Sequence, residues 1–191
     1  MAENIEIIHE DDSILAVSKP NNILVYASYF ARNIKDDDLV TLLKKQTELD
    51  LYPIHRLDRK TSGILLLAKE KEFVKDYQQQ FENNKVQKHY YAIVRGYCHS
   101  TGIIDTPTKN AETKMYKEAL TEYETIETIE LDIPVHPYDK SRYSLVKFTP
   151  KTGRMHQLRI HANKISHPIV GDYQYGDRFH NRMFENEFNW N

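Results

Sequence analysis

The chain has 191 residues, 40% of them hydrophobic and 28% charged, which is typical of a soluble globular protein with one domain. Its single cysteine, Cys98, excludes an internal disulfide framework and a zinc site built on cysteines. No basic region followed by an apolar run opens the chain, and the longest apolar stretch, Ile64 to Ala68, is far too short to span a membrane. We therefore expect a cytoplasmic protein with no membrane partner.

Charge is unevenly distributed along the chain, although the net charge of −2 does not by itself indicate a nucleic-acid partner. Residues 52–96 carry nine Lys or Arg against five Asp or Glu, and residues 150–182 carry six against two. If these two basic segments met in space, they would form one positive face suited to nucleic acid. Two separate solvated surfaces are the alternative, and charge alone leaves both open.

Hydrophobic periodicity and turn residues predict an alternation of strands and helices. The predicted strands are residues 5–9, 14–18, 63–69, 88–96, 119–129 and 142–148, and the predicted helices are residues 39–49, 70–81 and 156–165. The first helix follows three aspartates, Asp36 to Asp38, where negative charge suits the helix dipole. This order predicts an α+β fold, a mixed and mostly antiparallel sheet flanked by helices, in a single domain over residues 1–191.

Four short segments carry residues suited to chemistry. In the first, His55 to Gly63, Asp58 lies between two arginines, which favour an ionised carboxylate able to act as nucleophile or base. A surface Asp–Arg pair of little energetic weight is the simpler interpretation of such a dipeptide. The second segment, Lys88 to Gly96, alternates, so that Lys88, Tyr90, Ala92 and Val94 share one face of a strand. A strand with one aromatic side chain packed inside is its plain alternative.

The third segment, Thr152 to His161, is either a phosphate-binding surface or an exposed basic helix on which Met155, His156 and Arg159 lie together. His156 and His161 are five residues apart and fall on different sides of that helix, which argues against a metal site. The fourth segment, His167 to Gly176, contains proline and glycine and indicates a shaped loop.

Together and in this order, the four segments resemble the RluA-type family of pseudouridine synthases. The family patterns HRLD-x-x-TSG, K-x-Y-x-A-x-V-x-G, TGR-x-HQ-[LI]-R-x-H and HP-I-x-GD-x-x-YG match them, and the family's opening strand matches Ile14 to Pro20. The resemblance covers almost the whole chain. It implies the pseudouridine synthase catalytic fold and an isomerase that converts uridine to pseudouridine in structured RNA without a metal or another cofactor.

The resemblance also implies roles for particular residues. Asp58 is the essential carboxylate, which either attacks the sugar or removes a sugar proton. Arg159 pairs with that carboxylate, and Tyr90 packs against the flipped base and can remove its C5 proton. Arg56 occupies the space that the base leaves. The implied substrate-binding residues are His55, Arg56, Ile64, Lys88, Arg154 and Leu158, and Lys60 joins the basic residues that contact phosphates.

Residues 132–142 and 176–182 resemble the TruC-like branch of the family, which acts on uridine 65 in the T-stem of transfer RNA; ribosomal RNA is the alternative target. We expect a monomer without an S4-type RNA-binding domain and without the family's C-terminal segment. A non-catalytic RNA-binding or chaperone protein on the same fold need not keep Asp58, Tyr90 and Arg159 together. A hydrolase would want a second carboxylate or a metal near Asp58.

Overall fold

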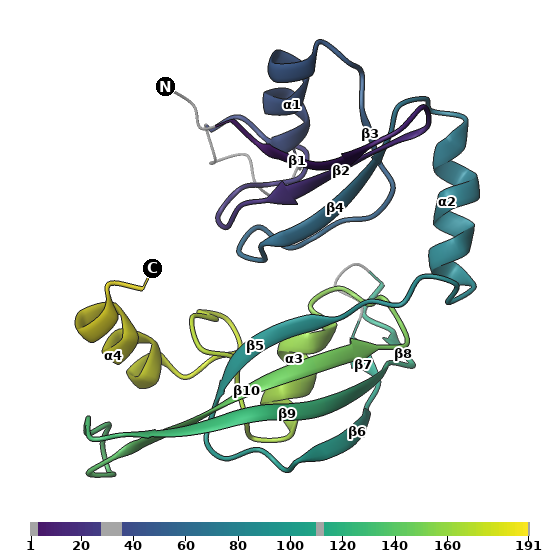
Figure 1. The fold of residues 1–191 in the computed structure, drawn as a ribbon. Coiled ribbons are helices and arrows are strands. Elements are labelled where there is room, and N and C mark those ends of the chain that lie inside the picture. The colour runs from purple at the N-terminus through teal and green to yellow at the C-terminus, as the bar shows by residue number, and fades with distance from the viewer. Residues whose placement is uncertain (1–3, 28–35, 110–112, 191) are drawn as a thin grey trace. The chain divides into compact units, whose positions relative to one another are not determined.

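A computed structural model describes residues 4–27, 36–109 and 113–190 of the chain (Figure 1). The chain packs as two compact units, residues 1–86 and 87–191, and each unit has its own antiparallel sheet and apolar core. Among the helices in these ranges, none combines the length and the apolar character that a membrane span requires. The expectation of a single catalytic domain over residues 1–191 depends on how the two units work together, and it stays a prediction.

The first unit is a four-stranded antiparallel sheet with the strand order β1-β2-β4-β3 and two helices. Its elements are β1 (Glu6–Glu10), β2 (Ile14–Lys19), α1 (Leu39–Thr47), β3 (Tyr52–Pro53), β4 (Gly63–Ala68) and α2 (Phe73–Glu82). Asp38 caps α1, since its carboxylate accepts a hydrogen bond from the backbone N–H of Thr41 at 2.8 Å. The predicted acidic start of this helix is thereby confirmed.

The core of this unit lies between α1 and the two central strands. Leu39 and Leu43 project from the same side of α1 because they are four residues apart. They pack against side chains of β2 and β4 that alternate inward, namely Leu15, Val17, Leu65 and Leu67. Fully burying side chains of this size contributes about 2 kcal/mol each. The loop between β3 and β4 therefore starts and ends on a rigid support.

The second unit is a four-stranded antiparallel sheet with the order β5-β10-β9-β6, a separate β7-β8 hairpin and two helices. Its elements are β5 (Tyr90–Arg95), β6 (Thr101–Asp105), β7 (Thr108–Lys109), β8 (Tyr116–Lys117), β9 (Leu120–Leu131), β10 (Ser141–Pro150), α3 (Gln157–Lys164) and α4 (Arg178–Phe188). The antiparallel α+β architecture expected from the sequence is thus confirmed in both units.

Strand β10 carries apolar side chains on both faces, and each face has its own cluster. Val146 and Phe148 pack with Val94 of β5 and Ala162 of α3. Tyr143 is an odd number of residues from Val146, so it points to the other face of the strand. There it packs with Met183 and Phe184 of α4 and with Val135 and Val170. The fit of α3 and α4 on opposite faces explains why β10 is so thoroughly buried.

The predicted strands and helices all occur, with ends shifted by at most three residues. One prediction about their faces is wrong. Helix α3 begins at Gln157, because His156 has the left-handed backbone angle φ = 55° and cannot continue a right-handed helix. Met155 and His156 therefore precede the helix and do not share a helical face with Arg159.

Five elements were not predicted: the short strands β3, β6, β7 and β8, and helix α4. The start of α4 has a recognisable signal, since Asp177 accepts hydrogen bonds from the backbone N–H groups of Phe179 and His180. The helix face is harder to recognise, because two of its four buried residues, His180 and Asn181, are polar. The repeat of apolar side chains every 3.6 residues, which predicts a helix, is therefore weak in this segment.

Two buried histidines make the stability of the second unit depend on pH. His161 is bonded through Nε2 to the carbonyl oxygen of Thr106 and through Nδ1 to the hydroxyl of Thr121, both at 2.9 Å. His180 shares a 2.7 Å hydrogen bond between its Nδ1 and the Tyr143 hydroxyl. Burial lowers the pKa of both imidazoles. Both rings are therefore held in the neutral form.

We expect the protein to lose stability as pH falls below about 6.5, the pKa of an unperturbed histidine. Below that pH the unfolded chain binds protons that the native state does not bind, so the unfolded state is favoured. The check is the urea midpoint of unfolding at pH 7.5 and pH 5.5. The double variant His161→Gln/His180→Gln should show a smaller fall than the wild type, whereas the exposed-site control His136→Gln should not. An unchanged pH dependence in the double variant would contradict this account.

Candidate functional site

Asp58 lies in the loop that joins β3 to β4 in the first unit, where its side chain is half-buried. The loop turns back at this point, since the Asp58 carbonyl oxygen accepts a hydrogen bond from the backbone N–H of Thr61 at 3.0 Å. Leu57 packs against the apolar core on one side of Asp58. Gly63, with φ = 128°, starts β4 on the other side and uses a backbone conformation that other residues rarely adopt. Asp58 thus has a defined position on a supported loop.

Lys19, the last residue of β2, holds this loop in place through hydrogen bonds. It was not predicted as a site residue. Its side chain is fully buried, with 0% exposure. The ammonium Nζ donates to three backbone carbonyl oxygens, those of Pro20 at 2.8 Å, Ile23 at 2.9 Å and Arg59 at 3.1 Å. The last of these follows Asp58 directly in the chain. One buried cation therefore ties the end of β2 to the loop that carries Asp58.

Two opposing effects act on the Lys19 ammonium. Burial lowers the pKa of Lys19 to about 8, and the negative charge of Asp58 acts in the opposite direction. The charge of Asp58 is therefore felt at Lys19 even though Nζ bonds to carbonyl oxygens. The sequence shows this lysine only as the end of a strand before a proline, and its burial depends on how the loop folds back over β2.

The other predicted site residues of the His55 to Gly63 segment lie in different surroundings from Asp58. The imidazole of His55 accepts a hydrogen bond at Nε2 from the backbone N–H of Leu66, at 3.1 Å, and its ring centroid lies 4.9 Å from that of Phe81 in α2. His55 therefore contacts the middle of β4 rather than the turn. Arg56 is exposed, and Ile64 exposes 60% of its surface although it belongs to a strand. Both can meet a ligand.

In the second unit, the predicted alternation of β5 is confirmed, because Tyr90 and Ala92 pack against the cluster that contains Val94. Leu158 of α3 packs against the same cluster. Lys88 precedes the strand and is half-buried, and burial lowers its pKa. Tyr90 is thus a ring held at the edge of a core, as a side chain that packs on a planar ligand would be.

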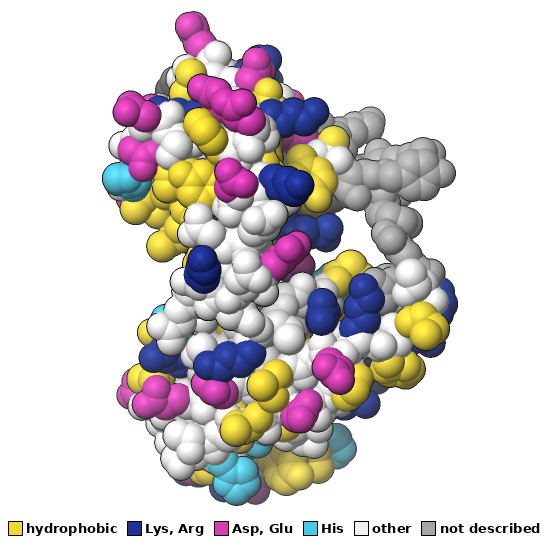
Figure 2. All heavy atoms as spheres, turned by 90° about the vertical axis from the view of Figure 1, so that its right-hand side faces the viewer, with side chains coloured by type: hydrophobic (Ala, Val, Ile, Leu, Met, Phe, Trp, Pro, Cys, Tyr) yellow, Lys and Arg dark blue, Asp and Glu magenta, His cyan; other side chains and the backbone are white. Residues whose placement is uncertain are grey.

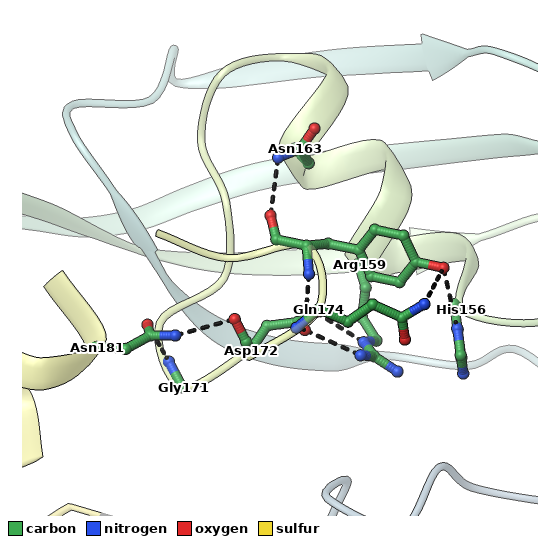
Figure 3. Close-up of polar contacts among 8 residues, drawn as sticks. His156, Arg159, Asn163, Gly171, Asp172, Gln174 and Asn181 are labelled. Atoms are coloured by element: carbon green, nitrogen blue, oxygen red, sulfur yellow. Dashed lines mark hydrogen bonds and ion pairs between the residues drawn. The ribbon is translucent and has the colours of Figure 1, made fainter. Parts of the chain in front are cut away.

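Arg159 of α3 is fixed by a buried carboxylate, Asp172, in the loop before α4 (Figure 3). Its Nε donates to Oδ2 at 2.7 Å and its Nη2 to Oδ1 at 2.9 Å, which is the bidentate geometry of a strong ion pair. The guanidinium carbon also lies 5.1 Å from the centre of the Tyr175 ring. Asp172 belongs to the segment predicted as a shaped loop, but a role for its side chain was not predicted. The expected pairing of Arg159 with Asp58 stays a prediction.

Several other residues of the Thr152 to His161 segment serve the fold. The side-chain oxygen of Gln157 accepts from the Thr152 hydroxyl at 2.7 Å and from the backbone N–H of Arg154 at 3.0 Å. Its amide nitrogen donates to the Thr121 hydroxyl at 3.0 Å. Arg154 is exposed and donates from Nε to the Glu118 carbonyl oxygen at 3.0 Å. The start of α3 is thereby pinned to β9, which leaves the Arg154 guanidinium at the surface.

A groove of about 730 Å³ lies beside this region, between the β7-β8 hairpin, α3 and the loop before α4. Its lining includes Lys109, Lys114 and Lys164, and none of the described residues that line it is Asp or Glu. Tyr116, which also lines the groove, is 69% exposed. Figure 2 shows a face of the molecule on which Lys and Arg are mixed with Asp and Glu. Three lysines and an exposed tyrosine at the groove are chemically suited to a polyanion with planar groups.

Among the residues that the structure describes, no three His, Cys, Asp or Glu side chains are grouped so that they could hold a metal ion.

Comparison with known proteins gives consistent matches. The family model described as RNA pseudouridylate synthase matches residues 13–164. The chain is 43% identical over 188 residues to tRNA pseudouridine synthase C of Pasteurella multocida, covering 93% of this chain and 77% of that protein. The protein of the same name from Haemophilus ducreyi is 41% identical over 192 residues, covering 93% and 76%. The solved structure of human RNA Pseudouridylate Synthase Domain Containing 1 superposes with a TM-score of 0.76 at 26% identity, covering 94% of this chain and 73% of that one.

Replacing Lys19 with Met should destabilise the protein by about 3 kcal/mol, because three buried carbonyl oxygens lose their donor. Urea unfolding measures this loss. The matched control is Lys45→Met on the surface of α1, where the ion pair with Asp37 is exposed and worth less than about 1 kcal/mol. Equal unfolding midpoints for the Lys19 variant and the wild type would remove Lys19 from its organising role.

Proposed function

The chain belongs to the RNA pseudouridylate synthase family, and from this membership we propose that it modifies transfer RNA, at uridine 65 of the T-stem. Members of this family are isomerases that convert uridine in RNA to pseudouridine, and this chain is such an enzyme. The proposed substrate is supported by the relatives named tRNA pseudouridine synthase C, which are 35–43% identical over most of the chain. This similarity over both units is the observation that carries the proposal.

The proposed reaction rearranges one nucleoside and leaves its composition unchanged. The bond from uracil N1 to the ribose C1′ breaks, the base turns, and a bond from C5 to C1′ forms. C5 loses its proton and N1 gains one, so atoms and electrons balance without a redox partner. Asp58 is the proposed catalytic residue, either as the nucleophile on the sugar or as the base that takes a sugar proton. Its half-buried position on a supported loop suits both roles.

Two residues of the second unit complete the proposed catalytic set. Arg159 would hold the ionised carboxylate of Asp58 through a guanidinium edge other than the Nε edge that faces Asp172. Tyr90 would pack against the detached base and accept the C5 proton. Both side chains come from elements packed in the core of the second unit, so their positions are well defined.

The target base must leave the stack to reach a carboxylate, which costs a few kcal/mol. We propose that the exposed Arg56 fills the vacated space with its planar guanidinium. Ile64, Leu158 and His55 would border the base. Lys60, Lys88 and Arg154 would contact phosphates and fix the register of the RNA.

The proposed catalytic residues Asp58 and Arg159 come from different units of one chain. We therefore propose that both units together form one catalytic domain and that the enzyme works as a monomer, since one chain supplies both residues. A transfer-RNA substrate supports a cytoplasmic enzyme.

The decisive experiment maps pseudouridine in total RNA from cells that lack the protein and carry either the wild type or a variant. We expect wild-type protein to restore pseudouridine at position 65 of transfer RNA. Asp58→Ala should lower product formation by a thousandfold or more, the usual loss for a catalytic nucleophile, while RNA binding stays nearly intact. The control Asp76→Ala removes an exposed carboxylate on α2 and should restore the modification fully.

The outcomes separate the parts of the proposal. Pseudouridine restored in ribosomal RNA instead would overturn the transfer-RNA substrate and leave the reaction standing. Efficient modification by Asp58→Ala would remove that residue from the catalytic set.

The groove beside α3 supports RNA as the partner, because three lysines line it and none of its described lining residues is Asp or Glu. We expect Lys109→Gln/Lys164→Gln to weaken RNA binding and to flatten the dependence of log Kd on log salt by about 0.7 to 0.9 per lost phosphate contact. Binding measured between low and moderate salt tests this. The control Lys140→Gln removes a lysine that pairs with Glu130 and Asp132, and its salt slope should equal that of the wild type. Equal slopes for all three proteins would remove the groove from the RNA interface.

A further inference from the structure

The Asp172 carboxylate accepts several hydrogen bonds from described residues. Besides the two bonds from Arg159, its Oδ1 accepts the backbone N–H groups of Gln174 at 2.9 Å and Tyr175 at 3.1 Å (Figure 3). Burial alone would raise the pKa of Asp172, but the hydrogen bonds from Arg159 and from the two backbone groups outweigh it and lower that pKa. The buried group is therefore a full anion at neutral pH.

The loop is shaped so that this carboxylate meets the guanidinium. The side-chain amide of Asn181 in α4 bonds the loop twice, donating to the Asp172 carbonyl oxygen and accepting from the Gly171 backbone N–H, both at 2.9 Å. Gly171 has φ = 82°. A side chain at Gly176 would place its first carbon 2.1 Å from the Asp172 carbonyl oxygen, which is sterically impossible without rearrangement. Glycine at position 176 thus permits the close turn around Asp172.

The consequence for Arg159 is a loss of freedom. An arginine side chain carries about 2 kcal/mol of rotamer entropy, and an exposed one samples many positions. Here the carboxylate holds the Nε edge, and the Tyr175 ring lies against the guanidinium. Tyr175 is itself held in place, since its hydroxyl is bonded to His156 Nδ1 at 3.2 Å. The backbone carbonyl oxygen of Tyr175 accepts a hydrogen bond from the side-chain amide of Asn163 at 2.7 Å. One edge and one face of the Arg159 guanidinium are therefore held in place before any ligand binds.

We propose that Asp172 is a positioning residue of the reaction, which orients the Arg159 guanidinium toward the reacting carboxylate and nucleotide. This inference rests on the proposed function, in which Arg159 acts on Asp58. Asp172 itself touches neither substrate nor reacting atoms. Its contribution is preorganisation, since a guanidinium that is already oriented need not be ordered in the transition state.

The natural alternative is that Asp172 only fastens the loop to α3. The chain offers a matched control for that alternative in Asp177, five residues further on. Asp177 also pairs with an arginine, Arg95, at 2.6 Å, and also accepts backbone N–H groups, those of Phe179 and His180. Loss of either charge should weaken this region to a similar degree. Of these two aspartates, Asp172 is the one that is bonded to Arg159.

The experiment compares Asp172→Asn with Asp177→Asn. Asparagine keeps an oxygen for the backbone N–H groups, but its NH2 group cannot accept the second hydrogen bond of the arginine. We expect Asp172→Asn to lower kcat about 100-fold with KM for RNA nearly unchanged, the loss typical of a misplaced catalytic partner. Asp177→Asn should keep kcat, with a similar loss of stability. Equal kcat losses in the two variants, or a wild-type kcat for Asp172→Asn, would overturn the inference.

A double variant tests whether Asp172 acts through Arg159. In an Arg159→Lys background, Asp172→Asn should lower kcat little further, because the bidentate partner is already gone. A full additional 100-fold loss there would mean that Asp172 acts by another route.

A measurement without turnover separates this inference from the proposed function. The Nε–H proton of Arg159 should give a slowly exchanging NMR signal in the wild type and in Asp177→Asn, and a fast-exchanging one in Asp172→Asn. Persistence of the slow signal in Asp172→Asn would sink the positioning role, whatever the enzyme makes. Absence of pseudouridine formation by the wild type, with the NMR pattern as expected, would instead sink the proposed function alone.

Discussion

A charged side chain withdrawn from water must be surrounded by partners, and both units of this protein build their loops under that constraint. In the first unit the ammonium of Lys19 gathers three carbonyl oxygens around itself. In the second the carboxylate of Asp172 gathers a guanidinium and two backbone N–H groups. Removing either charge leaves several polar groups without a partner, so each loop has one favoured shape. The side chains that these loops carry are ordered for the same reason.

The two buried charges have opposite sign and similar tasks. Lys19 holds the loop that carries Asp58, and Asp172 holds the side chain of Arg159, which the proposed mechanism pairs with Asp58. The proposed catalytic carboxylate, Asp58, and its proposed partner, Arg159, are thereby each backed by an ion that does not itself react. Such support fits catalysis by preorganised electrostatics, in which the groups are oriented before the transition state forms. It also explains why the polar Asn181 is buried, since its side-chain amide bonds the loop that carries Asp172 twice.

Both loops pack on apolar cores, and the burial of these cores offsets the free-energy cost of withdrawing the two charges from water. Leu57 packs the Asp58 loop against the core of the first unit, and Tyr90 and Leu158 pack against the core that contains Val94 and Ala162. The groove with its three lysines adds a surface that favours phosphates.

The sequence by itself determined the antiparallel α+β class, nearly all long strands, three of the four helices and the family, because these depend on local periodicity and on ordered motifs. Only the tertiary structure decided that Lys19 is buried and that Asp172 grips Arg159, since 40 residues separate Lys19 from Arg59 and 13 separate Arg159 from Asp172. Helix α4 was not predicted because two of its four buried residues are polar. The predicted helical position of Met155 was wrong because His156 has a left-handed backbone conformation. Contacts between distant segments leave no periodic signal in the chain, so burial and pairing appear only once it is folded.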